Sequence, residues 1–180
     1  MVILGTSHQL RAAANIQTID VAGSRLVVSD RVKSLGVTID SHLRFDYHAS
    51  NVARACNYHT RALRHVRSLL SDEVAQTVAC SIVASRLDYC NALLYGAPTA
   101  TINRLQRAQN NLARVVCQRG GRTHAAPLLQ SLHWLPVQHR ITYKTAVLTH
   151  KLLTTSTPSY LSDMLHTAAP ARHLLSLIHI

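Results

Sequence analysis

Adjacent acidic side chains, the usual ligands of catalytic metal ions, occur at one place in this chain. Asp72 and Glu73 follow Ser71, an order typical of a helix start, where serine caps free N–H groups and acids face the positive end of the helix dipole. Nucleotidyl transfer needs metal ions held by close carboxylates. Because helix capping accounts for this pair, we predict no metal site and no catalytic residue in the chain.

Histidine and cysteine are the other residue types that could bind a metal or act as a nucleophile. The chain has 12 histidines and 4 cysteines, but no C-x-x-C pair occurs, and neither His59 nor His65 has a histidine four positions away. This spacing predicts neither a zinc site nor a disulfide framework. Nothing in the sequence supports a Cys–His nucleophile, and we expect a reduced intracellular chain.

Basic side chains dominate the charge of the chain. Lys and Arg total 19 against 8 Asp and Glu, which gives a formal charge of +11 and a pI near 10.3. Such an excess favours a polyanionic partner. Nucleic acid is the first candidate and an acidic membrane surface the second. No apolar run is long enough to span a membrane, and no basic segment precedes the short apolar start, so neither a membrane span nor a secretory signal is predicted.

One group of arginines shares a predicted helix. From residue 46 to residue 70, apolar side chains recur at intervals of three and four, the period of a helix with one buried stripe. The only acid in this segment is Asp46. We expect the arginines outside the stripe to contact phosphates without sequence preference; an ordinary solvated helix face is the alternative. These arginines are Arg54, Arg61, Arg64 and Arg67.

A second group of arginines lies on the helix expected over residues 99–119. The apolar positions of this segment again recur at helical spacing, and Gly120 and Gly121 end it. The basic residues fall on another side of the helix. They form a second candidate patch for nucleic acid, made of Arg104, Arg107 and Arg114.

The remaining helical segments are marked by start and stop signals. A helix is expected from Ser71 to about residue 95, where Gly96 and Pro98 end it, and another begins at Pro136. A short helical turn is predicted over residues 127–132.

The composition bounds the number of domains. With 47% apolar residues in a length of 180, the chain can form one main domain with a hydrophobic core.

The first forty residues read as β-structure. Residues 16–21 and 25–28 are rich in β-branched side chains, and the small residues between them predict a hairpin. Residues 32–40 alternate apolar with small or polar side chains, which predicts a single half-buried strand with Gly36 leaving one face bare. We therefore predict a mainly α fold with a β segment over residues 1–40 and a helical region over 41–165, followed by a tail over 166–174.

Four ordered stretches carry a family resemblance. They are VKSLGVTID at 32–40, SRLDYCN at 85–91, LQRAQN at 105–110 and LHWLPV at 132–137, the last followed by Arg140-Ile141 and Tyr143-Lys144. In this order they resemble the region after the polymerase core of non-long-terminal-repeat (LINE) retrotransposon reverse transcriptases of the jockey and CR1 kind. The resemblance spans roughly residues 2–165 and corresponds to the primer grip and thumb of that enzyme.

The resemblance implies a helical thumb that follows the rim of a palm. Leu35, Gly36 and Val37 would hold the primer's 3′ end, with Lys33 beside a phosphate; an ordinary packed strand is the alternative. The palm aspartates that hold Mg²⁺ in the family have no counterpart here. The chain is thus expected to grip an RNA:DNA or DNA duplex without polymerising alone, and its implied partners are the palm and fingers of the parent polymerase.

Two further interpretations stay open. The chain could be a helical protein-interaction module, or a remnant of a dead element with no selected function. The resemblance implies a nuclear or cytoplasmic ribonucleoprotein as its location. The last six residues, 175–180, have no counterpart in the family, and we interpret them as read-through from a sequencing adapter.

Overall fold

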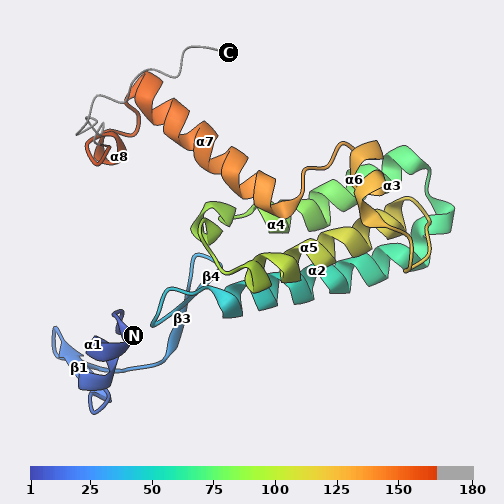
Figure 1. Ribbon diagram of the computed structural model, residues 1–180. Helices are drawn as coiled ribbons and strands as arrows, with labels where there is room; N and C mark the ends of the chain where they lie inside the picture. The colour runs from blue at the N-terminus through green and yellow to red at the C-terminus, as the bar shows by residue number, and fades with distance from the viewer. Residues whose placement is uncertain (166–180) are drawn as a thin grey trace. The chain divides into compact units, whose positions relative to one another are not determined.

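The computed structural model describes residues 1–165, so the segments expected over 166–174 and 175–180 lie outside the described residues. The fold is mainly helical, with two short antiparallel strand pairs near the N-terminus (Figure 1). This confirms the predicted fold class. The chain divides into two compact units, Met1–Lys144 and Thr145–Ile180, and helix α7 begins in the first and continues into the second.

A short helix that the sequence pattern did not predict opens the first unit. α1 spans Ser7–Ala12, and Thr6 and Gln9 form a capping box at its start. In that box the Thr6 hydroxyl accepts from the Gln9 N–H, and the Gln9 side chain accepts from the Thr6 N–H. The T-x-x-Q spacing was the available signal for this helix.

The predicted hairpin near residue 20 is confirmed. Strand β1, Thr18–Val21, pairs antiparallel with β2, Ser24–Val27. The connecting turn consists of Ala22 and Gly23, whose φ angles are 48° and 76°. Two positive φ angles in a two-residue loop make the turn type whose twist matches the flanking strands.

The prediction of one strand over residues 32–40 is wrong, because the chain reverses in the middle of that segment. Strand β3, Arg31–Ser34, pairs antiparallel with β4, Val37–Asp40, and Leu35 and Gly36 form the turn with φ angles of 46° and 82°. The alternation of apolar residues predicts that Leu35 lies on the buried face of one strand. In the structure Leu35 lies in the turn and is 88% exposed. Glycine suits position 36 because the backbone there has a positive φ angle, which residues with a Cβ atom rarely adopt.

The core of the first unit forms around two long helices that pack side by side (Figure 1). α2 spans Asp46–Val66 and α5 spans Thr99–Val116, which confirms both predicted helices. The predicted apolar stripe of α2 is only partly correct: Cys56 and Leu63 are buried, but Val66 is exposed. Four other buried residues complete this face of α2: His48, Ala49, Ala53 and Thr60.

The segment between these helices is interrupted instead of forming the single helix expected up to residue 95. α3, Asp72–Ala79, runs into a π-helical turn, η2, at Cys80–Ala84 and then into α4, Ser85–Asp88. A short 3-10 turn, η3, follows at Asn91–Leu94. The start is as predicted, since the Ser71 hydroxyl accepts from the Val74 N–H at 3.3 Å.

The remaining helices follow the predicted order. η1, Arg67–Leu69, is a 3-10 turn that extends α2. α6 covers Ala125–Ser131 and packs against α5, and α7 covers Val137–Thr155. In the second unit, α8 covers Ser159–Ser162. Within residues 1–165 no helix is both long and apolar enough to cross a membrane.

Candidate nucleic-acid interface

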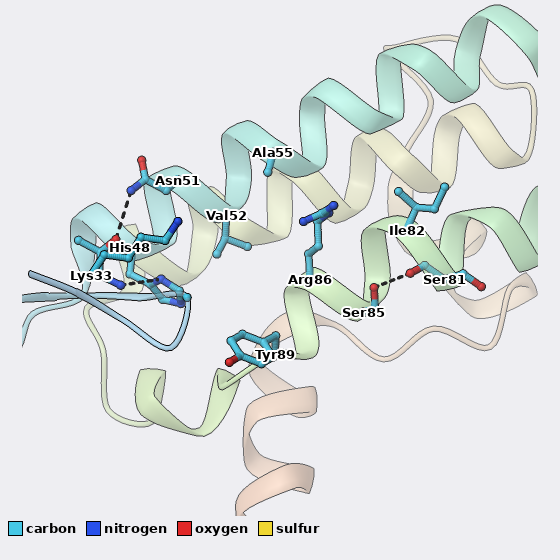
Figure 2. Close-up of a pocket in the computed structure, with 12 residues that line it drawn as sticks. Lys33, His48, Asn51, Val52, Ala55, Ser81, Ile82, Ser85, Arg86 and Tyr89 are labelled. Atoms are coloured by element: carbon cyan, nitrogen blue, oxygen red, sulfur yellow. Dashed lines mark hydrogen bonds between the residues drawn. The ribbon is translucent and has the colours of Figure 1, made fainter.

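An open cleft of about 790 Å³ lies where the β3–β4 hairpin meets α2 and the η2–α4 segment. Figure 2 shows Lys33 from the hairpin and His48 and Asn51 from α2 on one side, with Arg86 and Tyr89 on the other. Three stretches that are distant in sequence thus form one hollow. Its lining residues are Lys33, Gly36, Thr38, His48, Asn51, Val52, Ala55, Ser81, Ile82, Ser85, Arg86 and Tyr89.

The cleft carries positive charge without a counter-charge. Lys33 and Arg86 line it, and its lining contains no aspartate or glutamate. The only side-chain ion pairs within residues 1–165 involve Arg25, Arg67 and Arg140, so both cleft cations are available to an external anion. Cations of one sign lining a hollow raise the local concentration of anions such as phosphate.

His48 adds a neutral hydrogen-bond donor to this cleft. Its ring is 4% exposed, and Nδ1 accepts a hydrogen bond from the Thr38 backbone N–H at 3.4 Å. Because Nδ1 is the acceptor, the ring proton is assigned to Nε2, which becomes a donor. Burial lowers the pKa of His48 below its ordinary value of 6.5, which keeps the imidazole neutral at pH 7. Nearby, Asn51 Nδ2 donates to Thr38 Oγ1 at 3.4 Å.

Tyr89 fastens the tip of the hairpin to the helical layer. Its hydroxyl donates to the Leu35 carbonyl oxygen at 2.6 Å. A Cβ on Gly36 would lie 3.5 Å from Tyr89 Cε1, an ordinary contact. Val37, which the resemblance places with Leu35 and Gly36 at the primer end, is buried and packs inward. Leu35, Gly36 and Lys33 remain exposed at the hairpin.

The arginines of α2 do not join this cleft. Arg54, Arg61 and Arg64 are exposed, as predicted. At about 100° per residue, their mean direction lies roughly 140° around the helix axis from that of Asn51, Val52 and Ala55. The structure therefore presents two separate basic surfaces, the cleft and an arginine face of α2 made of Arg54, Arg61 and Arg64.

Arg67 belongs to neither surface, and the prediction that it lies on the exposed face is wrong. Its side chain is 5% exposed. Nε donates to the Val116 carbonyl at 2.8 Å, Nη1 donates to the Leu70 carbonyl at 2.9 Å, and Nη2 pairs with Asp72. Carbonyls left free at helix ends need donors. Arg67 supplies those donors and therefore has a structural role.

The second predicted patch is reduced in the same way. Arg104 Nη1 donates to Ser50 Oγ at 2.7 Å and to the Asp46 carbonyl at 3.3 Å, joining α5 to α2. Arg114 Nε donates to the Thr123 carbonyl at 2.8 Å. Arg107 alone of the three is exposed. These contacts leave Arg107 as the member of the patch that is free to meet a ligand.

Three residues of the cleft were missed as site residues: His48, Arg86 and Tyr89. Arg86 and Tyr89 stand in the stretch at 85–91 that carries the family resemblance, but their spacing alone gave no role. The π-helical turn just before them changes which residues face the cleft, and such turns are frequent at functional sites. Nothing in the sequence pattern marked the π-turn.

Asp88 of α4 pairs with Arg140 of α7 at 2.7 Å. No group of three or more His, Cys, Asp or Glu side chains that could hold a metal ion occurs in residues 1–165.

Comparison of the chain with models of protein families, with curated proteins and with solved structures finds no match.

Proposed function

We propose that this chain is the template–primer-binding segment of a non-long-terminal-repeat retrotransposon reverse transcriptase, and that it binds duplex nucleic acid without performing the polymerase chemistry. The observation that carries the proposal is the cleft, where Lys33 and Arg86 face an open hollow whose lining contains no carboxylate. The cleft lies beside the Leu35–Gly36 turn, the segment that the resemblance assigns to the primer end.

Binding in the cleft would act through the phosphate backbone. Arg86 offers the planar fork that matches two phosphate oxygens, and Lys33 acts as a point charge. The His48 Nε2–H adds a donor that does not depend on protonation near pH 7. These groups recognise phosphates and carry no base-reading geometry, so binding with little sequence preference is expected.

The arginine face of α2 is a second contact surface for duplex nucleic acid, separate from the cleft. Arg54, Arg61 and Arg64 repeat along one side of a helix of 21 residues. Exposed arginines in such a row neutralise phosphates and release counterions. The two surfaces together carry five basic side chains, whereas Arg67, Arg104 and Arg114 are used in internal contacts.

Polymerisation is assigned to another part of the parent enzyme. The adjacent acids Asp72 and Glu73 lie in the first turn of α3, and Asp72 is the partner of Arg67. Mg²⁺ would be held by palm aspartates of the parent polymerase, whose palm and fingers are the protein partners in this proposal. A nuclear or cytoplasmic ribonucleoprotein is the corresponding location.

The first test measures the affinity of the purified chain for a 20-base-pair RNA:DNA hybrid by fluorescence anisotropy over a salt series. The double variant Lys33→Ala/Arg86→Ala should weaken binding by about 10- to 100-fold and flatten the plot of log affinity against log salt by about 1.8, since each lost phosphate contact removes about 0.9. The matched control is Arg119→Ala/Arg122→Ala, which removes the same charge from exposed positions outside both surfaces.

If both double variants lost the same affinity for the hybrid, the cleft residues would act only through the net charge of the chain. That result would contradict the assignment of the cleft as the binding site. The triple variant Arg54→Ala/Arg61→Ala/Arg64→Ala tests the arginine face separately. A salt slope that is unchanged in this triple variant would remove that face from the interface and leave the cleft alone.

A protein-interaction module is the second candidate, and α7 favours it. Val147, Leu148 and Leu153 are exposed on this helix, and exposed apolar side chains along one helix are typical of a protein-binding surface. Capture of a partner from cell extract that survives nuclease treatment and is lost in Leu148→Ser/Leu153→Ser would support this candidate. Capture that depends on nucleic acid would support the first.

A further inference from the structure

A second, smaller pocket of about 330 Å³ forms where α4, the loop after α6 and the start of α7 meet, all within the first unit. It gathers residues from two of the four stretches that carry the resemblance, 85–91 and 132–137 with its continuation, although nothing above assigns it a role. Its lining residues are Asp88, Asn91, His133, Leu135, Arg140, Tyr143 and Lys144.

Part of this pocket is a fixed frame. Arg140 Nη1 pairs with Asp88 Oδ2 at 2.7 Å, and Arg140 Nε donates to the Leu135 carbonyl at 2.8 Å. Asn91 Nδ2 donates to Asp88 Oδ1 at 3.5 Å. These contacts engage the Arg140 guanidinium and the Asp88 carboxylate with each other and with their neighbours in the pocket wall.

One polar atom of the pocket is left over. Asn91 is 4% exposed, and its Oδ1 is the one buried side-chain polar atom in residues 1–165 that has no hydrogen-bond partner. Buried acceptors without a donor are costly and rare in folded proteins. A ligand that brings an N–H group to this oxygen would remove that cost.

The other free groups of the pocket define the rest of the ligand. Tyr143 is 64% exposed and Leu135 is 47% exposed, so an aromatic ring and an apolar side chain face the opening. Lys144 supplies a cation beside them. The complementary ligand has an N–H donor, a flat apolar ring and a negative charge.

We infer that this pocket binds one unpaired nucleotide, with the base against Tyr143, an N–H of its pairing edge donating to Asn91 Oδ1, and its phosphate near Lys144. The inference rests on the proposed function and deepens it: duplex lies in the cleft and on the arginine face, and a single-stranded nucleotide enters this pocket. In a duplex the pairing-edge N–H groups are already used. The volume lies at the small end of the range for ligand pockets, about 300–1,000 Å³, and suits one base.

The test compares two probes by fluorescence anisotropy: a blunt 20-base-pair RNA:DNA hybrid, and the same hybrid with three unpaired adenosines at one 3′ end. The full chain should bind the overhang probe about tenfold more tightly, the effect expected of one base stacked on an aromatic side chain. Tyr143→Ala and Asn91→Leu should each bring that affinity down to the blunt level and leave blunt binding unchanged. Tyr160→Ala, an exposed tyrosine of the second unit, is the matched control.

Equal affinity of the unmodified chain for both probes would overturn this inference alone, because the duplex would still be bound. Absence of binding to the blunt hybrid at low salt would overturn the proposed function as well. Since Asn91 is buried, the circular dichroism spectrum of Asn91→Leu is checked first. The exposed Tyr143→Ala variant keeps the test decisive if Asn91→Leu does not fold.

Discussion

Two arginines that lie beside helix α2 use their side chains in opposite ways. Arg67, in the 3-10 turn that follows α2, is buried and donates to two backbone carbonyls and to Asp72. Arg86, in α4, lines an open cleft and has no ion-pair partner within residues 1–165. One arginine completes the fold, and the other is left for a ligand.

The difference teaches that charge alone does not identify a binding surface. Arg67 donates to the backbone carbonyls of Val116 and Leu70, which lie at helix ends. A guanidinium has five N–H donors and can therefore satisfy several such carbonyls at once. Arg86 lies in α4 and makes no side-chain ion pair within residues 1–165. An arginine is available to a ligand only where its neighbours leave its donors unused.

The largest effect is expected from Arg67→Ala. Loss of the side chain leaves the Val116 and Leu70 carbonyls without their donor, and we expect the free energy of unfolding to fall by about 3 kcal/mol. Urea unfolding followed by circular dichroism measures this change. Arg64→Ala is the control, because an exposed arginine three positions earlier should change stability by less than about 0.5 kcal/mol. Similar losses in both variants would remove the contrast between buried and exposed arginines of this helix.

The next effect concerns the start of α2, where the Asp40 carboxylate accepts from the backbone N–H groups of His42, Arg44 and Phe45 at 3.1, 3.2 and 2.8 Å. Asp40→Ala should lower the free energy of unfolding by about 2 kcal/mol, since the buried carboxylate fixes the loop that leads into α2 through three hydrogen bonds. Urea unfolding again gives the value. Asp30→Ala, an exposed acid nearby, should change little; a loss as large as that of Asp40→Ala would show that these hydrogen bonds do not matter.

A smaller effect is expected from Tyr89→Phe, which removes only the hydroxyl that donates to Leu35. Because Tyr89 is half exposed, we expect the loss in stability to stay below about 1 kcal/mol. Amide hydrogen exchange should nevertheless accelerate at β3 and β4 and stay constant in α5. Unchanged exchange in the hairpin would mean that packing, and not this hydrogen bond, holds the turn beside the cleft. Tyr95→Phe serves as the control, because Tyr95 is exposed and lies outside the cleft lining.

The smallest effect is a pH dependence from His48. Burial lowers its pKa in the folded chain, so below the ordinary value of 6.5 the unfolded chain binds a proton that the folded chain resists. The contribution of His48 to stability is therefore complete above about pH 6.5 and decreases as the pH falls. Between pH 7.5 and pH 5.0 the unmodified chain should lose more stability than His48→Gln, measured by urea unfolding. An identical loss in both would place the pH dependence on other groups.

Much of the helical architecture was predictable from local signals. The Ser71 cap, the glycine and proline after residue 95, and the apolar period of α2 and α5 each act over a few residues, so they are visible in sequence. The π-turn at 80–84 and the reversal at Leu35–Gly36 were not, because both depend on packing against neighbouring elements. Tyr89, for example, contacts the turn from 54 positions away in the chain.

The sequence by itself determined that the chain is mainly helical and strongly basic. Only the tertiary structure decided which basic residues face solvent: it buried Arg67, engaged Arg104 and Arg114, and placed Lys33 with Arg86 in one cleft. The physical reason is that a guanidinium finds its hydrogen-bond acceptors through long-range packing. Periodicity gives the face of a helix, but the neighbours of that face come from distant parts of the chain.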